Sequence, residues 1–264
     1  MSIEKALADT QPPFGLEGRR ALVTGGASGI GEATVQELTR AGAFVWIADI
    51  NLAAADRLAG QVGAAKAIQL DVTNPESISA AVERVGQLDI LVNNAGIGHV
   101  GSIENTEAAD FDRLLNVNVR AVYLVTRAFL PFLLTAESRT GHAGTIVNLG
   151  SVAGMVGIKQ RFAYCTTKGA VIAMTRQLAV EYPKTLRVNV ICPGTVETPF
   201  VEGYLDNFHK DNKEQIRVEL RARQPIGRLG QPQEIASMVR YLVSDEAAFI
   251  SGSIFTIDGG WTAA

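Results

Sequence analysis

Residues 20–31 have the sequence RALVTGGASGIG, a short apolar run that ends in a glycine-rich turn. The run is typical of a buried β-strand, and the apolar positions Ile30, Ala33, Val35 and Leu38 recur at helical spacing after the turn. The glycines allow the backbone to approach a diphosphate closely, and the following helix offers free N–H groups at its positive end. Gly-x-x-x-Gly-x-Gly is a variant of the dinucleotide-binding fingerprint. The stretch therefore predicts a strand, a phosphate-binding turn and a helix.

Strand-like and helix-like segments alternate along the rest of the chain. The expected strands cover residues 20–24, 43–49, 65–70, 88–92, 145–149, 187–192 and 253–258, and the expected helices cover 29–41, 52–60, 75–85, 107–134, 161–182, 211–223 and 232–243. Most of these strands are solidly apolar, which is typical of a parallel sheet buried on both faces. We therefore predict an α/β fold with a single Rossmann-type, doubly wound parallel sheet of about seven strands and helices on both faces. Pro131 is expected to bend or interrupt the helix over 107–134.

Composition and charge limit the class of protein. Residues 1–17, interrupted by Pro12, Pro13 and Gly15, are expected to form a flexible leader, and 18–264 a single domain. The net charge of −3 argues against a nucleic-acid partner, which would favour a basic excess. We find no apolar stretch long enough to predict a membrane span and no signal peptide, so we expect a cytoplasmic protein without a membrane partner. The 2 cysteines and 3 histidines lack metal-ligand spacing, so no metal is expected.

Acidic and small residues follow the second, third and fourth strands. Asp49 could accept hydrogen bonds from ribose hydroxyls and would repel a 2′-phosphate, and no Lys or Arg lies in residues 41–56 to neutralise one. This favours NAD over NADP, although Asp49 could also cap the next helix. Asp71 could face the adenine amino group or cap the helix that begins near Pro75. Residues 93–96 could let a cofactor lie against the backbone or could form a plain turn.

Tyr164 and Lys168 are four residues apart on a predicted helix, so they share a face. A nearby ammonium lowers the pKa of a tyrosine, whose ordinary value is about 10. Such a tyrosine can act as a base for an alcohol or as an acid for a ketone. Ser151 follows the fifth strand and Asn118 lies in the helix after the fourth, so both are expected at the same sheet edge.

These stretches resemble the short-chain dehydrogenase/reductase family from about residue 18 onward. The matching residues are TGGASGIG at 24–31, Asp71, NNAG at 93–96, Asn118 in NVNVR, Ser151, YCTTK at 164–168 and PGTVET at 193–198. The resemblance implies an NAD-dependent oxidoreductase that needs no metal. Members commonly form homotetramers, and the tail GGWTAA resembles the end that forms the interface in many of them.

The resemblance also implies a role for each residue of the site. Tyr164 would exchange the proton, Ser151 would bind the reacting oxygen, and Lys168 would bind the nicotinamide ribose and tune Tyr164. Asn118 would hold a water that links Lys168 to solvent. With Tyr164 and Lys168, the expected cofactor contacts are Gly25, Ser28, Gly29, Ile30, Gly31, Asp49, Ile50, Asp71, Val72, Asn93, Ala95, Gly96, Pro193, Gly194, Thr195, Val196 and Thr198.

The polar, irregular residues 196–225 correspond to the lid that covers substrate in this family. Within it, the chain is most similar to the cytosolic hydroxybutyrate dehydrogenase type and to bacterial enzymes that oxidise 2-keto-3-deoxy sugar acids such as 2-keto-3-deoxy-L-fuconate. Both act on carboxylates held by arginines, which makes Arg161 and Arg223 candidate substrate contacts beside Ser151 and Tyr164. Each arginine could instead be a surface residue. Tyr204 stands where the hydroxybutyrate type has an arginine, which favours a larger, hydroxylated acid.

The sequence thus predicts an NAD-dependent dehydrogenase of a secondary alcohol in a small hydroxy acid or sugar acid. A 3-hydroxybutyrate-type enzyme and another sugar or polyol dehydrogenase stay open as alternatives. A non-catalytic dinucleotide-binding regulator is disfavoured, because Tyr164 and Lys168 are both present.

Overall fold

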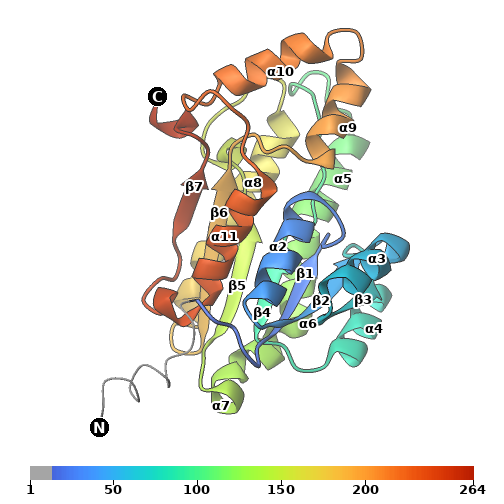
Figure 1. Cartoon of the computed structure of the whole chain (residues 1–264). Helices are drawn as coiled ribbons and strands as arrows, with labels where there is room; N and C mark the ends of the chain where they lie inside the picture. The colour runs from blue at the N-terminus through green and yellow to red at the C-terminus, as the bar shows by residue number, and fades with distance from the viewer. Residues whose placement is uncertain (1–13) are drawn as a thin grey trace.

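The computed structural model describes residues 14–264, in which seven strands form one parallel sheet (Figure 1). The strands are β1 (Arg20–Thr24), β2 (Phe44–Asp49), β3 (Ala65–Gln69), β4 (Ile90–Asn93), β5 (Gly144–Leu149), β6 (Leu186–Pro193) and β7 (Ile254–Ile257). Their order is β3-β2-β1-β4-β5-β6-β7, which confirms the predicted doubly wound sheet. The direction of winding reverses between β1 and β4, and in such sheets ligands bind at that point, beyond the carboxyl ends of the strands.

Helices cover both faces of the sheet (Figure 1). Those on one face are α2 (Gly29–Arg40), α3 (Leu52–Val62) and α11 (Pro232–Val243), and those on the other are α4 (Pro75–Val85), α6 (Ala121–Leu134) and α8 (Phe162–Glu181). Val35, Leu58 and Val239 belong to the first core layer, whereas Ile78 and Phe129 belong to the second. Shorter elements are α7 (Ala136–Thr140) and 3₁₀ turns at Val152–Gly154, Asp245–Ala247 and Trp261–Ala263.

The long helix after β4 is interrupted, but the predicted place was wrong. The break is a π-helical turn, Asn116–Arg120, between α5 (Ala108–Leu115) and α6, whereas Pro131 lies inside α6. The π-helical turn carries Asn118, whose side chain bonds the chain beyond β4. A π-turn within an α-helix is rare and frequently marks a functional site.

The run from Ala108 to Leu134 is also long and apolar enough, by length and composition, to cross a membrane. Its inner face packs on the sheet instead, because Val125, Phe129 and Leu133 are at most 1% exposed within the second core layer. The segment is therefore a covering helix of the fold.

The predicted lid is more regular than expected. It contains α9 (Pro199–Phe208) and the predicted charged helix, α10 (Lys213–Ala222), which both stand above the carboxyl ends of the strands (Figure 1). Thr198 caps α9 through the Val201 amide, with Pro199 in the first turn. The lid has its own core, made of Val201, Leu205, Ile216, Leu220 and Leu229. Its helices are thus folded elements rather than irregular chain.

The leader was predicted over residues 1–17, of which 1–13 lie outside the described residues. For residues 14–17 the prediction of a flexible segment is wrong. Leu16 is 1% exposed and its amide donates to the Ala41 carbonyl, and the Phe14 ring lies 5.8 Å from the Tyr241 ring. Apolar burial therefore fixes this stretch against α2 and α11.

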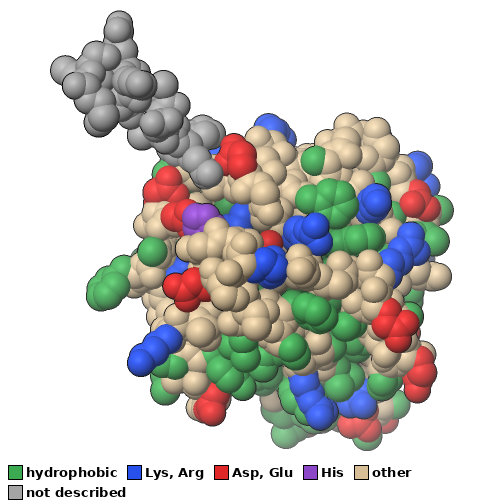
Figure 2. Space-filling view, turned by 90° about the horizontal axis from the view of Figure 1, so that it is seen from below, with side chains coloured by type: hydrophobic (Ala, Val, Ile, Leu, Met, Phe, Trp, Pro, Cys, Tyr) green, Lys and Arg blue, Asp and Glu red, His purple; other side chains and the backbone are tan. Residues whose placement is uncertain are grey.

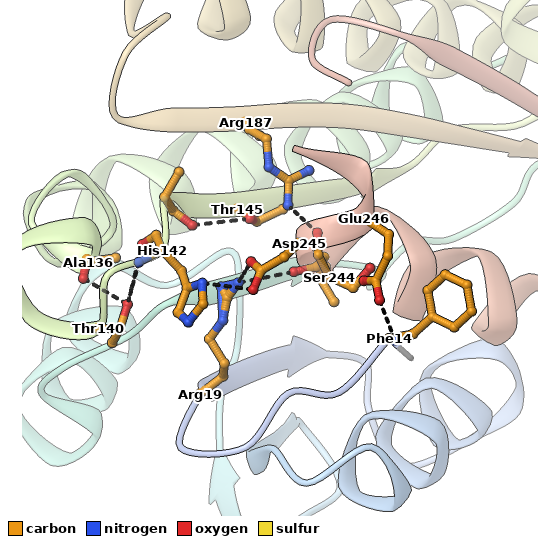
Figure 3. A network of polar contacts seen from close by, with 12 residues as sticks. Phe14, Arg19, Ala136, Thr140, His142, Thr145, Arg187, Ser244, Asp245 and Glu246 are labelled. Atoms are coloured by element: carbon orange, nitrogen blue, oxygen red, sulfur yellow. Dashed lines mark hydrogen bonds and ion pairs between the residues drawn. The ribbon is translucent and has the colours of Figure 1, made fainter. Parts of the chain in front are cut away.

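Two buried arginines cap the end of α11 (Figure 3), on the side of the molecule away from the lid helices α9 and α10 (Figure 1). Arg187 on β6 donates to the carbonyls of Leu242 and Ser244 at 2.6 and 3.0 Å. Arg19 pairs with Asp245 at 3.1 Å, and Asp245 also contacts His142. Cations at a helix C-terminus compensate its dipole and its free carbonyls. Burial and the nearby Arg19 lower the pKa of Arg187 to about 10.

Seen from below (Figure 2), this side of the molecule carries both signs of charge among hydrophobic side chains.

Arg187→Met should lower the free energy of unfolding by about 2 kcal/mol, because two buried carbonyls lose a charged donor. Urea unfolding followed by circular dichroism measures the change, and exposed Arg57→Met on α3 is the control, expected within about 0.5 kcal/mol of the parent. Equal unfolding midpoints for the Arg187 variant and the control would show that the cap contributes nothing.

Candidate active site

The glycine turn after β1 is built to receive a phosphate group. Gly25 and Gly29 have φ of +59° and +55°, and a Cβ on Gly31 would lie 2.1 Å from the Gly25 oxygen, so larger residues would not fit. Ser28 precedes α2 without capping it through its side chain, which leaves the N–H groups of the first turn available. The turn therefore fits a dinucleotide diphosphate at the helix N-terminus.

Asn94, which the sequence interpretation did not single out, holds this turn against β4. Its side-chain amide donates to the carbonyls of Thr24 and Gly25 at 3.0 and 2.9 Å. In return, the Thr24 hydroxyl accepts from the amides of Asn94 and Ala95. These bonds join the ends of β1 and β4 at the point where the sheet reverses direction. In the sequence, the second asparagine of NNAG at 93–96 was the feature that could have pointed to this contact.

Asp49 borders the same turn. Its carboxylate accepts from the amides of Ala27 and Asn51 at 3.0 and 2.9 Å, while Ile50 beside it is 67% exposed. Asp71 bonds the amide and hydroxyl of Thr73. Neither aspartate is a helix N-cap, because Asn51 caps α3 and Asn74 caps α4. Both aspartates therefore lie at the strand ends, as predicted, and the alternative that they cap helices is wrong.

A cavity of about 630 Å³ lies at the carboxyl edge of the sheet beneath the lid. The expected site residues that line it are Gly25, Ser28, Gly29, Ile30, Ala95, Gly96, Ser151, Arg161, Tyr164, Lys168, Pro193, Gly194, Thr195, Val196, Thr198 and Arg223. The expected residues outside its lining are Gly31, Asp49, Ile50, Asp71, Val72, Asn93 and Asn118. Most of the predicted catalytic, cofactor and substrate residues therefore meet in one place.

The side chain of Asn93 does not reach the cavity. It is 4% exposed and donates to Thr126 and Asn148 at 3.1 and 2.9 Å. Asn148 in turn donates to Thr175. These buried polar groups satisfy one another's hydrogen bonds between β4, β5 and the helices α6 and α8. The Asn93 side chain therefore stabilises the fold instead of lining the cavity.

Tyr164 and Lys168 both face the cavity from α8. The Lys168 ammonium lies 5.8 Å from the Tyr164 ring centroid and donates to the Leu149 carbonyl at 2.8 Å. Ser151 follows on the same strand end, where its hydroxyl accepts from the Ala153 amide at 3.1 Å. The end of β5 and the first turns of α8 thus bring a phenol, a hydroxyl and a buried ammonium together.

The prediction that Lys168 lowers the pKa of Tyr164 is wrong for the chain by itself. Burial raises the pKa of Tyr164 to about 12, although the Ser151 side chain and the Arg161 charge oppose the rise. Burial also lowers the pKa of Lys168 to about 8, so the ammonium that was expected to lower the Tyr164 pKa loses its own proton more easily. At neutral pH Tyr164 is therefore protonated, the form that can donate to a carbonyl oxygen.

Asn118, in the π-helical turn, fixes the chain that follows β4. It is 1% exposed, and its amide exchanges two 2.8 Å hydrogen bonds with the backbone of Ile97. It also donates to the Thr167 hydroxyl. A Cβ on Gly96 would lie 3.3 Å from the Asn118 oxygen and 3.7 Å from the Lys168 nitrogen, so the chain after β4 passes close to both.

Arg161 and Arg223 form the opposite end of the cavity, together with two aromatic rings. The Arg161 guanidinium lies 4.3 Å from the Tyr204 ring centroid and donates to the His99 carbonyl at 3.0 Å. Arg223 lies 5.8 Å from the Trp261 ring centroid. Burial lowers the pKa of Arg161, and the charge of Arg223 contributes to that lowering. Within residues 14–264 neither guanidinium has a carboxylate partner.

A family model described as enoyl-(acyl carrier protein) reductase matches residues 25–262, nearly all of the sheet and the whole cavity. The chain belongs to the short-chain dehydrogenase/reductase family. Its fold, its TGGASGIG turn and its Tyr164–Lys168 pair agree with that membership. The predicted resemblance is thus confirmed, and the protein is an oxidoreductase of this family.

Several similar members are known. A 2-(S)-hydroxypropyl-CoM dehydrogenase 3 from Xanthobacter autotrophicus is 41% identical over 91% of this chain and 95% of its own. A 2-keto-3-deoxy-L-fuconate dehydrogenase from Xanthomonas campestris is 39% identical over 96% and 83%. A solved 3-ketoacyl-(acyl-carrier-protein) reductase from Brucella melitensis, complexed with NADH, is 38% identical with a TM-score of 0.83, over 93% and 99% of the two chains.

The buried Lys168 of this short-chain dehydrogenase/reductase should show in the pH dependence of folding. Its pKa is about 8 when folded and near 10.5 when unfolded, so the unfolded state binds more protons between these values. Stability should therefore rise with pH across this window, by up to about 3 kcal/mol, relative to Lys168→Met. Urea unfolding of both proteins from pH 6 to 10 measures the difference. Parallel curves through this window would contradict the buried charge.

Proposed function

We propose that the protein is an NAD-dependent dehydrogenase that oxidises a secondary alcohol of a small acid, with a 2-keto-3-deoxy sugar acid as the leading candidate. The observation that carries the proposal is the pair Arg161 and Arg223, whose guanidiniums line the cavity without a carboxylate partner among residues 14–264. An unpaired guanidinium in a partly buried site favours an anion, and its planar fork fits a carboxylate. Tyr164 lines the same cavity, close enough to Arg161 for that charge to act on its phenol.

Proton transfer falls to Tyr164. In ketone reduction its hydroxyl donates a proton to the substrate oxygen. In alcohol oxidation the phenol first has to lose its own proton to solvent, and the phenolate then takes the proton of the alcohol. The Ser151 hydroxyl is available to hydrogen-bond the same oxygen. In the chain by itself burial keeps Tyr164 protonated despite the nearby Lys168, so we propose that the phenolate forms when oxidised nicotinamide adds its positive charge beside Lys168. When bound, the nicotinamide ring supplies the hydride acceptor or donor.

NAD, rather than NADP, is supported by the surroundings of Asp49. Its carboxylate stands beside the glycine turn, between the Ala27 and Asn51 amides. Residues 41–56 contain no Lys or Arg that could pair with a 2′-phosphate. A like charge would repel that phosphate, so we propose that NADP binds more weakly. A solved relative that was complexed with NADH agrees with this choice.

The sugar-acid reading is supported by the relative named 2-keto-3-deoxy-L-fuconate dehydrogenase, at 39% identity. The relative named 2-(S)-hydroxypropyl-CoM dehydrogenase, at 41%, makes its own named substrate a second candidate. A cavity of about 630 Å³ has room for a nicotinamide and a short polar acid. Oxidation of the two named compounds therefore belongs in the same assay.

The test is a panel of hydroxy acids, each beside its neutral methyl ester, with NAD or NADP and read by absorbance of the reduced cofactor. The protein should prefer acids to esters by at least about tenfold in kcat/KM, because a charged hydrogen bond is worth roughly 1.5–3 kcal/mol. Arg161→Met should remove most of that preference by raising KM for the acids.

The matched control is Arg113→Met. Arg113 also lines the cavity, but it already pairs with Asp110 at 3.4 Å, so its loss should leave the acid preference intact. Equal turnover of acids and esters by the parent protein would overturn the acid proposal. Equal use of NADP would overturn the role given to Asp49.

We also propose that the protein assembles as a homotetramer. Large apolar side chains remain exposed in the described chain, among them Val180 at 76%, Phe249 at 104% and Tyr123 at 50%. Members of this family commonly form homotetramers, and association of subunits would bury such side chains.

A further inference from the structure

Gln224 lies next to Arg223, but its side chain turns into the protein instead of the cavity. It is 2% exposed, and both ends of its amide are bonded. The side-chain oxygen accepts from the Thr195 amide at 3.1 Å, and the side-chain nitrogen donates to the Arg228 carbonyl at 2.9 Å. Gln224 therefore bonds the segment after α10 to the end of β6.

The end of β6 is one wall of the cofactor half of the cavity. Gly194, Thr195 and Val196 all line it. The Thr195 carbonyl accepts from the Gly230 amide, so both backbone groups of Thr195 are held by the segment 224–230. A Cβ on Gly194 would lie 2.6 Å from the Gln224 oxygen, which shows how closely the amide packs under this wall.

The same segment packs against the turn that carries the aromatic partner of Arg223. Its chain packs on the turn at residues 258–260, where a Cβ on Gly259 would lie 3.3 Å from the Gln224 Cβ. Asp258 holds that turn by accepting from the amides of Gly260 and Thr262 at 3.0 and 2.8 Å. The turn carries Trp261, the ring beside the Arg223 guanidinium.

We infer that Gln224 is a positioning residue that holds the cofactor wall at Thr195 and the substrate arginine Arg223 in one rigid unit. The inference rests on the proposed function for the roles of these two neighbours. Loss of the Gln224 amide should therefore weaken cofactor binding and acid binding together, although Gln224 touches neither ligand.

Asn189, on the strand β6 that leads to Thr195, offers a matched control. It is fully buried, accepts from the Ser253 amide at 3.1 Å and donates to the Ile250 carbonyl at 2.9 Å. Its amide thus joins two backbone segments as that of Gln224 does, but Asn189 is not part of the cavity lining. A variant at Asn189 reports what the loss of a buried amide does to stability alone.

The experiment measures the NADH dissociation constant by fluorescence, without substrate, for Gln224→Met, Gln224→Glu and Asn189→Leu. Gln224→Met should weaken NADH binding roughly tenfold, because the Thr195 amide loses its acceptor. Gln224→Glu, which burial should keep neutral, retains an acceptor for that amide and an O–H donor for the Arg228 carbonyl, so it should stay within about threefold of the parent. Asn189→Leu should lower the unfolding midpoint and leave NADH affinity within about twofold.

The steady-state arm uses the best acid of the panel. Gln224→Met should raise KM for NAD and for the acid, whereas Arg161→Met should raise only the latter. The inference is overturned if Gln224→Met leaves NADH affinity unchanged, if Gln224→Glu is equally weak, or if Asn189→Leu weakens NADH equally. Because NADH affinity is measured without substrate, failure of the acid proposal would appear separately, as equal turnover of acids and esters.

Discussion

The buried ammonium of Lys168 is the constraint around which the active end of this molecule is arranged. Its 2.8 Å bond to the Leu149 carbonyl fastens α8 to the end of β5, and so fixes Tyr164 beside Ser151. Burial lowers the pKa of Lys168 to about 8, which means that the folded chain pays for holding this charge. A costly buried charge with one backbone partner is typical of a residue kept for chemistry rather than for stability.

The sequence predicted the sheet and most of the site because both depend on local signals. Apolar runs marked the strands, and parallel strands bring their carboxyl ends to one edge, so Ser151 and the residues after each strand had to meet there. Long-range packing was not visible in the same way. The burial that raises the pKa of Tyr164, the π-helical turn at Asn118 and the inward side chain of Asn93 all depend on neighbours distant in sequence.

The lid shows the same division. Its polar composition predicted irregular chain with one charged helix, yet apolar positions such as Val201, Leu205 and Leu220 give α9 and α10 a small core of their own. That core holds Tyr204 over Arg161, while the segment that follows holds Arg223 beside Trp261. The end of the cavity that we propose for substrate is thus formed by folded elements, which are joined through the end of β6 to the wall that we propose for the cofactor.

The central claim is that Tyr164 transfers the proton in this site, and Tyr164→Phe tests it most directly. Turnover of the best panel substrate should fall by a factor of about 10²–10⁴, the usual contribution of a positioned acid or base. NADH affinity and the unfolding midpoint should stay close to those of the parent. If Tyr164→Phe retained more than about a tenth of the parent kcat, the loss of general acid–base catalysis would be too small, and the account would be contradicted.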